Sequence, residues 1–191
     1  MWTIKQPPKI IFGKNSVQEF SFPEKCLVIT SKGARSRGWL EYTGLNNQII
    51  FDTVESNPSL ETAEKIISQF KNLDFSHVIG LGGGSSMDVA KYCAFKMNKL
   101  KIMIPTTFGS GSEVTRISVL KVDGKKKSFH DDGIFANIAI IDSHFIENSD
   151  DKIIKNSVID ACAQCTEAYD SKLANPYTKF LCNSAFDLLE E

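Results

Sequence analysis

Short apolar runs alternate with amphipathic stretches through the first three quarters of the chain. The runs are rich in β-branched residues and are bounded by glycine, proline or polar residues, which is typical of buried strands. They lie at residues 9–13, 26–30, 48–52, 77–81, 101–104 and 138–142. Apolar residues at helical spacing follow the third run, over 62–70 with Ser59 as N-cap, and the fourth run, over 87–97. Buried strands that alternate with helices predict a parallel sheet.

The pattern changes after the fifth run. Apolar and polar residues alternate over 113–122, which predicts a strand, and the Asp-Gly pair at 123–124 predicts a hairpin turn. Strand signals end near residue 148. Helical spacing then covers 151–169, and an Asn-Pro pair starts a further helix over 175–191.

The predicted fold class is therefore α/β, with a parallel-sheet domain at residues 1–147 followed by the first helices of an all-helical domain at residues 148–191. Apolar residues make up 42% of the 191 residues and charged residues 24%, so the chain can bury a substantial core. This composition excludes disordered and collagen-like classes. No apolar run approaches the ~20 residues that a membrane-spanning helix needs.

Charge and cysteine content narrow the function further. The chain has 22 basic and 23 acidic residues, so no general attraction to nucleic acid or to anionic membranes is expected. The N-terminus carries no apolar signal core, and the five cysteines are scattered, which predicts reduced thiols and a cytoplasmic location. Cys162 and Cys165 have redox spacing but fall inside a helical pattern, which disfavours a redox role.

Two loops carry the strongest chemical signals. Residues 82–85, Gly-Gly-Gly-Ser, join a strand to a helix, where a close backbone approach and unpaired N–H groups suit a phosphate. Residues 105–113, Pro-Thr-Thr-Phe-Gly-Ser-Gly-Ser-Glu, directly follow the next strand. Ligands of open α/β sheets bind at the carboxyl ends of strands, so the two loops together fit one elongated ligand such as a dinucleotide. Taken singly, each loop is also compatible with an ordinary connection.

Asp160 and Gln164 form a third feature. They lie four residues apart in a predicted helix and share a face with Glu167. Two oxygen donors could contribute to a metal site but do not complete one. Without further context, this stripe is more simply the solvated side of an amphipathic helix.

Together and in this order, the motifs resemble those of the iron-containing (group III) alcohol dehydrogenase family of the dehydroquinate-synthase-like superfamily. Residues 82–91, GGGSSMDVAK, are very similar to the family motif GGGS-x-x-D-x-A-K. Residues 104–115, IPTTFGSGSEVT, match its second long motif almost residue for residue. Shorter similarities occur at 8–13, 51–58 and 159–171, so the resemblance covers nearly the whole chain.

The resemblance implies a Rossmann-like dinucleotide-binding domain and metal-dependent, NAD(P)-linked hydride transfer between a small alcohol and its aldehyde or ketone. It places the pyrophosphate at Gly83, Gly84 and Ser85. The other implied cofactor contacts are Asn57, Asp88, Thr106, Thr107, Ser110, Thr115 and Lys126. It also makes Asp160 the first ligand of a divalent metal, Fe or Zn, which would polarise the substrate oxygen.

Three departures from the family pattern matter. Gln164 occupies a metal-ligand position that is commonly His, and an amide is the poorer ligand. The two further histidine ligands of the family come later in its helical domain, so the chain is expected to be a truncated member. Ser31 stands where NAD-preferring relatives often carry Asp; this removes a repulsion of the 2′-phosphate, with which Lys32 or Arg35 could pair, and weakly favours NADP over NAD.

Two alternative functions stay open on the sequence. One is a glycerol-1-phosphate dehydrogenase or dehydroquinate-synthase-like enzyme, against which the close match at residues 105–115 argues. The other is a non-catalytic nucleotide-binding fragment. The expected partner is a small-molecule alcohol or aldehyde, with no nucleic acid and no membrane; a homodimer is left open. The substrate itself is not readable from the sequence.

Overall fold

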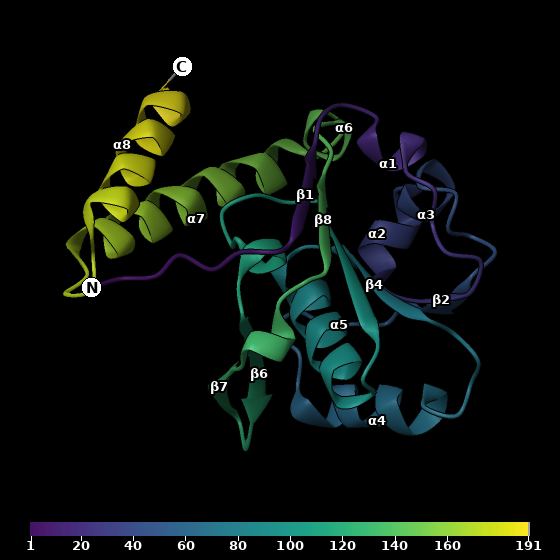
Figure 1. Ribbon diagram of the computed structural model, residues 1–191. Helices are drawn as coiled ribbons and strands as arrows, with labels where there is room; N and C mark the ends of the chain where they lie inside the picture. Colours follow the sequence, from purple (N-terminus) through teal and green to yellow (C-terminus); the bar gives the residue numbers. More distant parts are fainter. Residues whose placement is uncertain (191) are drawn as a thin grey trace.

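The computed structural model describes residues 1–190 and contains a six-stranded sheet with the order β1-β8-β5-β4-β2-β3 (Figure 1). Its strands are β1 (Lys9–Phe12), β2 (Cys26–Ile29), β3 (Ile49–Phe51), β4 (His77–Gly82), β5 (Leu100–Pro105) and β8 (Ile138–Ile141). Each corresponds to one of the predicted apolar runs. All of their pairings are parallel, which confirms the α/β prediction.

Helices cover both faces of this sheet. They are α1 (Ser16–Glu19), α2 (Lys32–Ser36), α3 (Trp39–Tyr42), α4 (Leu60–Phe70), α5 (Gly84–Lys96) and α6 (His144–Glu147). Side chains alternate between the faces of a strand, so the core forms two clusters. Leu27 and Ile29 of β2 pack in the cluster that contains residues of α4 and α5, whereas Cys26 and Val28 pack in the cluster that contains residues of α3 and α6.

The two longer helices of this domain are close to their predicted ranges. Ser59 caps α4, and its Oγ accepts a hydrogen bond from the Thr62 N–H at 3.2 Å. Helix α5 begins three residues before the predicted 87–97, because Gly83 rather than a later residue is its N-cap. The short helices α1, α2, α3 and α6 were not predicted, since four or five residues are too few to show a helical period.

The predicted strand at 113–122 is wrong in its first half. Ser112–Val114 form a 3₁₀ helix, η1, and only Ile117–Val122 form a strand, β6. The ammonium of buried Lys91 donates hydrogen bonds to the Ser112 and Ile117 carbonyls, and these bonds hold the intervening residues out of a strand conformation. The hairpin prediction is confirmed: β6 pairs antiparallel with β7 (Lys125–His130) across a turn at 123–124 in which both residues have positive φ. A second 3₁₀ helix, η2 (Asp132–Ile134), follows.

The last two helices, α7 (Asp151–Asp170) and α8 (Pro176–Glu190), pack against each other and extend away from the sheet (Figure 1). Both agree with the predicted helices over the described residues. Their outer surfaces carry large exposed apolar side chains, which include Ile159, Phe180 and Leu188. Within residues 1–190, no helix combines the length and the apolar character needed to span a bilayer.

Candidate functional site

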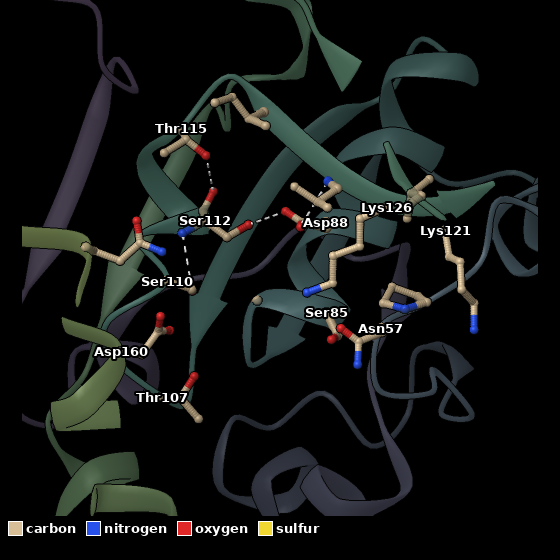
Figure 2. A pocket seen from close by; sticks show the side chains of 16 residues that line it. Asn57, Ser85, Asp88, Thr107, Ser110, Ser112, Thr115, Lys121, Lys126 and Asp160 are labelled. Carbon is tan, nitrogen blue, oxygen red and sulfur yellow. Dashed lines mark hydrogen bonds between the residues drawn. The ribbon is translucent and has the colours of Figure 1, made fainter. Parts of the chain in front are cut away.

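A cavity of about 520 Å³ opens at the carboxyl ends of β4 and β5 (Figure 2). Its walls come from the N-terminus of α5, the loop after β5, the β6–β7 hairpin and helix α7. Most of the predicted site residues line it, namely Asn57, Gly84, Ser85, Asp88, Thr107, Ser110, Thr115, Lys126, Asp160 and Gln164. The fold therefore brings together two loops and a helix that are far apart in sequence.

A second cavity of about 210 Å³ shares Gly84, Ser85 and Thr107 with the first, so the two adjoin. The remaining predicted site residues line this smaller cavity, namely Ser31, Gly83 and Thr106. Every predicted cofactor or metal residue thus faces one of two neighbouring cavities. Together, the cavities form an elongated site along the carboxyl edge of the sheet.

The glycine loop leaves room that no other residue would leave. A Cβ on Gly83 would lie 3.1 Å from Thr107 Oγ1, and one on Gly84 would lie 3.1 Å from Ser110 Cβ. The absence of these side chains lets the two loops approach closely. Because Gly83 is the N-cap of α5, no side chain caps this helix. Its first-turn N–H groups are left for a ligand, and this arrangement fits the diphosphate of a dinucleotide.

Asp88 lines the larger cavity, but its carboxylate also braces the cavity wall. Its Oδ1 accepts from Ser112 Oγ at 2.6 Å, and its Oδ2 accepts from the Val119 N–H at 3.1 Å (Figure 2). Ser112 and Lys121 also line the cavity and were not predicted as site residues. Ser112 lies inside the second long motif, which is a signal that sequence reasoning could have used. Lys121 offered no signal beyond its charge.

The β6–β7 hairpin brings two lysines to the cavity. Lys126 stands directly opposite Lys121 in the strand register, and in Figure 2 the Lys126 side chain points toward Ser85. The hairpin is tied to the loop at Asn57 because the Lys121 N–H donates to the Pro58 carbonyl at 2.8 Å. Neither lysine forms an ion pair with any part of the chain between Met1 and Glu190. Their charge is therefore available to an anionic ligand.

Asp160 and Gln164 enter the cavity from α7, and Figure 2 places Asp160 on the side away from Asn57. The loop after β5 touches this helix at Gly109, where a Cβ would lie 2.8 Å from both Ser157 O and Ala161 N. The pair supplies two oxygen donors. Among residues 1–190, no group of three or more His, Cys, Asp or Glu side chains could hold a metal ion. The donor set therefore does not fit a complete metal site.

Ser31 is the N-cap of α2, and its Oγ accepts from the Ala34 N–H at 3.3 Å. Arg35, which the sequence offered as a partner for a 2′-phosphate, forms an ion pair with Asp52 instead. Arg35 lies on α2 and Asp52 directly follows β3, and the ion pair holds the guanidinium against the Asp52 carboxylate. Arg37 is the arginine that lines the smaller cavity.

Burial shifts the pKa values of two charged groups beside the site. Desolvation lowers the pKa of the Lys91 ammonium, and the nearby Asp88 carboxylate opposes this shift. Burial raises the pKa of Glu113, an effect that Lys91 opposes. The two groups therefore stabilise each other's charged forms in a region that water hardly reaches.

Comparisons with known proteins identify the family to which this chain is similar. The family model described as "Iron-containing alcohol dehydrogenase" matches residues 7–143. The 4-hydroxybutyrate dehydrogenase of Clostridium kluyveri is 35% identical over 150 residues, which cover 69% of this chain and 40% of that protein. The NADPH-dependent butanol dehydrogenase of Clostridium saccharobutylicum is 29% identical over 206 residues, which cover 95% and 50%.

Among solved structures, an iron-containing alcohol dehydrogenase of Thermotoga maritima superimposes with a TM-score of 0.90 at 27% sequence identity. The alignment covers 99% of this chain and 61% of that one. The chain thus spans about half the length of the relatives that it matches.

Proposed function

Since the chain belongs to the iron-containing alcohol dehydrogenase family, we propose that it is the cofactor-binding part of an NAD(P)-linked oxidoreductase that interconverts a small alcohol and its aldehyde or ketone. The observation that carries this proposal is the convergence of the glycine loop and the hydroxyl-rich loop on one cavity beside an uncapped helix N-terminus. Members of the family use NAD(P) and a divalent metal ion.

The cofactor residues divide by chemistry. Gly84 and Ser85 would hold the diphosphate at the N-terminus of α5, where backbone N–H groups and the helix dipole favour negative charge. Lys126 adds a cation on the open side of the cavity. The hydroxyls of Thr107, Ser110 and Thr115 offer hydrogen bonds along the wall. When bound, the nicotinamide supplies or accepts the hydride.

Asp160 and Gln164 are proposed as two ligands of Fe or Zn. Because residues 1–190 bring no complete donor set together, no step of the reaction is assigned to a metal ion. The chain's own contribution to catalysis is thus to bind and orient the dinucleotide. The substrate, a small alcohol or aldehyde, would bind near Asp160, at the end of the cavity remote from Asn57.

Ser31 supports a preference for NADP over NAD. Its small neutral side chain adds no carboxylate to the smaller cavity beyond that of Glu55, so a 2′-phosphate beside Ser31 meets no like charge from this position. Lys32 stays a candidate partner for this phosphate, and Arg37 joins it because it lines the same cavity as Ser31. The cytoplasmic location and the homodimer stay predictions.

The experiment that tests the function is a titration of the 191-residue chain with NADPH and with NADH, followed by fluorescence. Saturable binding of either cofactor supports the proposal, and its absence contradicts it. Reduction of a small aldehyde is then assayed with added Fe²⁺ or Zn²⁺. Binding without turnover would favour the second candidate, a nucleotide-binding fragment, which the incomplete donor set around Asp160 supports.

A further inference from the structure

Lys91 is a charged side chain that is fully buried, which is rare for lysine. It lies on α5 with 0% of its surface exposed, and it is among the largest fully buried side chains of the domain. Its Nζ donates to the Ser112 carbonyl at 2.7 Å and also to the Ile117 carbonyl. Weaker contacts reach the Thr115 carbonyl at 3.4 Å and Thr115 Oγ1 at 3.3 Å. One ammonium thus binds three backbone carbonyls, those of Ser112, Thr115 and Ile117.

Asp88 completes this arrangement one helical turn earlier. Its Oδ1 lies 3.3 Å from the Lys91 Nζ, so the buried cation has a carboxylate partner. Asp88 also accepts hydrogen bonds from Ser112 Oγ and from the Val119 N–H, and its carbonyl accepts one from Ser118 Oγ at 2.8 Å. The segment from Ser112 to Val119 is therefore bound at both ends to a single helix, α5.

These bonds determine what the segment offers to the cavity. Ser112 and Thr115 line the cavity wall. The Ser112 hydroxyl proton is engaged by Asp88, and the Thr115 hydroxyl donates to the Ser112 carbonyl at 3.4 Å (Figure 2). Both hydroxyls are left as hydrogen-bond acceptors on their free side. This wall suits an N–H or O–H group of a ligand rather than a phosphate.

We propose that Lys91 is a positioning residue for the cofactor: from beneath the cavity, it fixes the Ser112–Ile117 wall and the direction of the wall's hydroxyls. The proposal rests on the function proposed above. Lys91 touches no ligand itself and acts through Ser112 and Thr115. Without its ammonium, the Ser112 carbonyl would keep only the 3.4 Å contacts from the Thr115 N–H and Oγ1, the Ile117 carbonyl would lose its bond to Lys91, and the segment would rearrange to recover partners.

The test compares Lys91→Met with Lys101→Met. Lys101 is also a mostly buried lysine, but its Nζ donates only to the Lys99 carbonyl at 3.3 Å, away from both cavities. We expect Lys91→Met to weaken NADPH binding at least 10-fold and to speed amide hydrogen exchange across residues 112–119, but not across α4. Lys101→Met should stay within twofold of the wild type in both measurements. Both variants are expected to melt at a lower temperature.

Four outcomes would overturn the proposal. The first is a folded Lys91→Met chain with wild-type NADPH affinity, and the second is unchanged exchange in residues 112–119. The third is an equal loss of affinity in Lys101→Met. If Lys91→Met does not fold, Lys91→Gln, which keeps N–H donors, is measured in its place, with an intermediate loss of affinity expected. The fourth is failure of both Lys91→Met and Lys91→Gln to fold while Lys101→Met folds, since that would give Lys91 a role in stability alone.

Failure of the proposed function is distinguishable from these outcomes. A wild-type chain that does not bind NADPH or NADH would contradict the cofactor role of the cavity. The exchange comparison needs no cofactor, so it would still decide whether Lys91 holds the Ser112–Ile117 segment.

Discussion

The sheet domain and the α7–α8 pair differ in how far their apolar side chains are buried. In the sheet domain, strand residues such as Val28 and Ile79 are fully buried, and even a buried lysine has all its partners within the domain. In α7–α8, Ile159, Phe180 and Leu188 leave 65% or more of their surface exposed. The cavity sits where the two regions meet. The difference teaches that the sheet domain buries its apolar side chains within itself, whereas α7 and α8 leave large apolar side chains exposed and contribute Asp160 and Gln164 to the cavity.

The largest effect on NADPH affinity is expected at the glycine loop of the sheet domain. Gly84→Val would place its Cβ 3.1 Å from the Ser110 side chain, with its methyl groups in the space left for the diphosphate. If the N–H groups at the start of α5 bind the diphosphate as proposed, displacing it from them should weaken NADPH binding about 100-fold, as measured by fluorescence titration.

The matched control is Gly133→Val. Its Cβ would lie 2.7 Å from the Phe95 ring, away from either cavity, so it should lower the melting temperature and leave NADPH affinity nearly unchanged. If the two variants lose affinity equally, the loop has no special role in binding the diphosphate.

The second effect tests the junction between the two regions. Gly109 has φ +102°, and a Cβ there would meet the backbone of α7, which cannot move as a flexible side chain could. Gly109→Ala should reduce the free energy of unfolding by about 2–4 kcal/mol through overpacking and backbone strain, as measured in urea.

Gly111→Ala is the control for backbone strain alone, because Gly111 also has a positive φ but a Cβ added there would meet no heavy atom within 4 Å. It should cost about 1 kcal/mol. Equal losses for the two glycines would mean that the contact with α7 contributes nothing to stability.

The third effect concerns cofactor choice at the smaller cavity. Ser31→Asp introduces a carboxylate where a 2′-phosphate is proposed to bind, and it keeps an oxygen that can cap α2. The ratio of NADPH affinity to NADH affinity should fall about 10- to 30-fold, because like charges in a shielded site repel. Ser31→Asn introduces a side chain that is nearly the same size as Asp but neutral, and it should leave the ratio within threefold of the wild-type value. A ratio that does not change in Ser31→Asp would place the 2′-phosphate elsewhere.

The smallest effect is at the hairpin. Lys126→Gln removes a cation that lines the cavity, and NADPH affinity should fall about 5-fold, with a weaker dependence on salt concentration. Lys125→Gln removes a neighbouring charge on the same strand that faces neither cavity, and it should change affinity by less than twofold. Indistinguishable salt dependences for the two variants would assign both lysines to general surface charge.

The sequence predicted the six strands because each is a buried apolar run, and the parallel pairing followed from their alternation with helices. It predicted that the glycine loop and the hydroxyl loop meet at one edge of the sheet because each follows a strand, and the residues of both loops line adjoining cavities. It mistook residues 113–116 for strand because alternation does not reveal that Lys91 of α5 binds the carbonyls of Ser112, Thr115 and Ile117. The sequence also offered Arg35 as a partner for a phosphate, because its ion pair with Asp52 exists only once the chain has folded. The local pattern of residues along the chain does not show which distant groups a charged side chain will pair with.

The bonds from Asp88 and Lys91 to the segment after β5 have a practical consequence for protein engineering. Helix α5 and the segment after β5 are expected to keep their shape best when they are moved together, since two side chains of the helix bind the segment. A chimera that takes the continuous stretch from Gly82 to Val119, with the intervening strand β5 included, would keep Asp88, Lys91 and the loop that they bind in one piece.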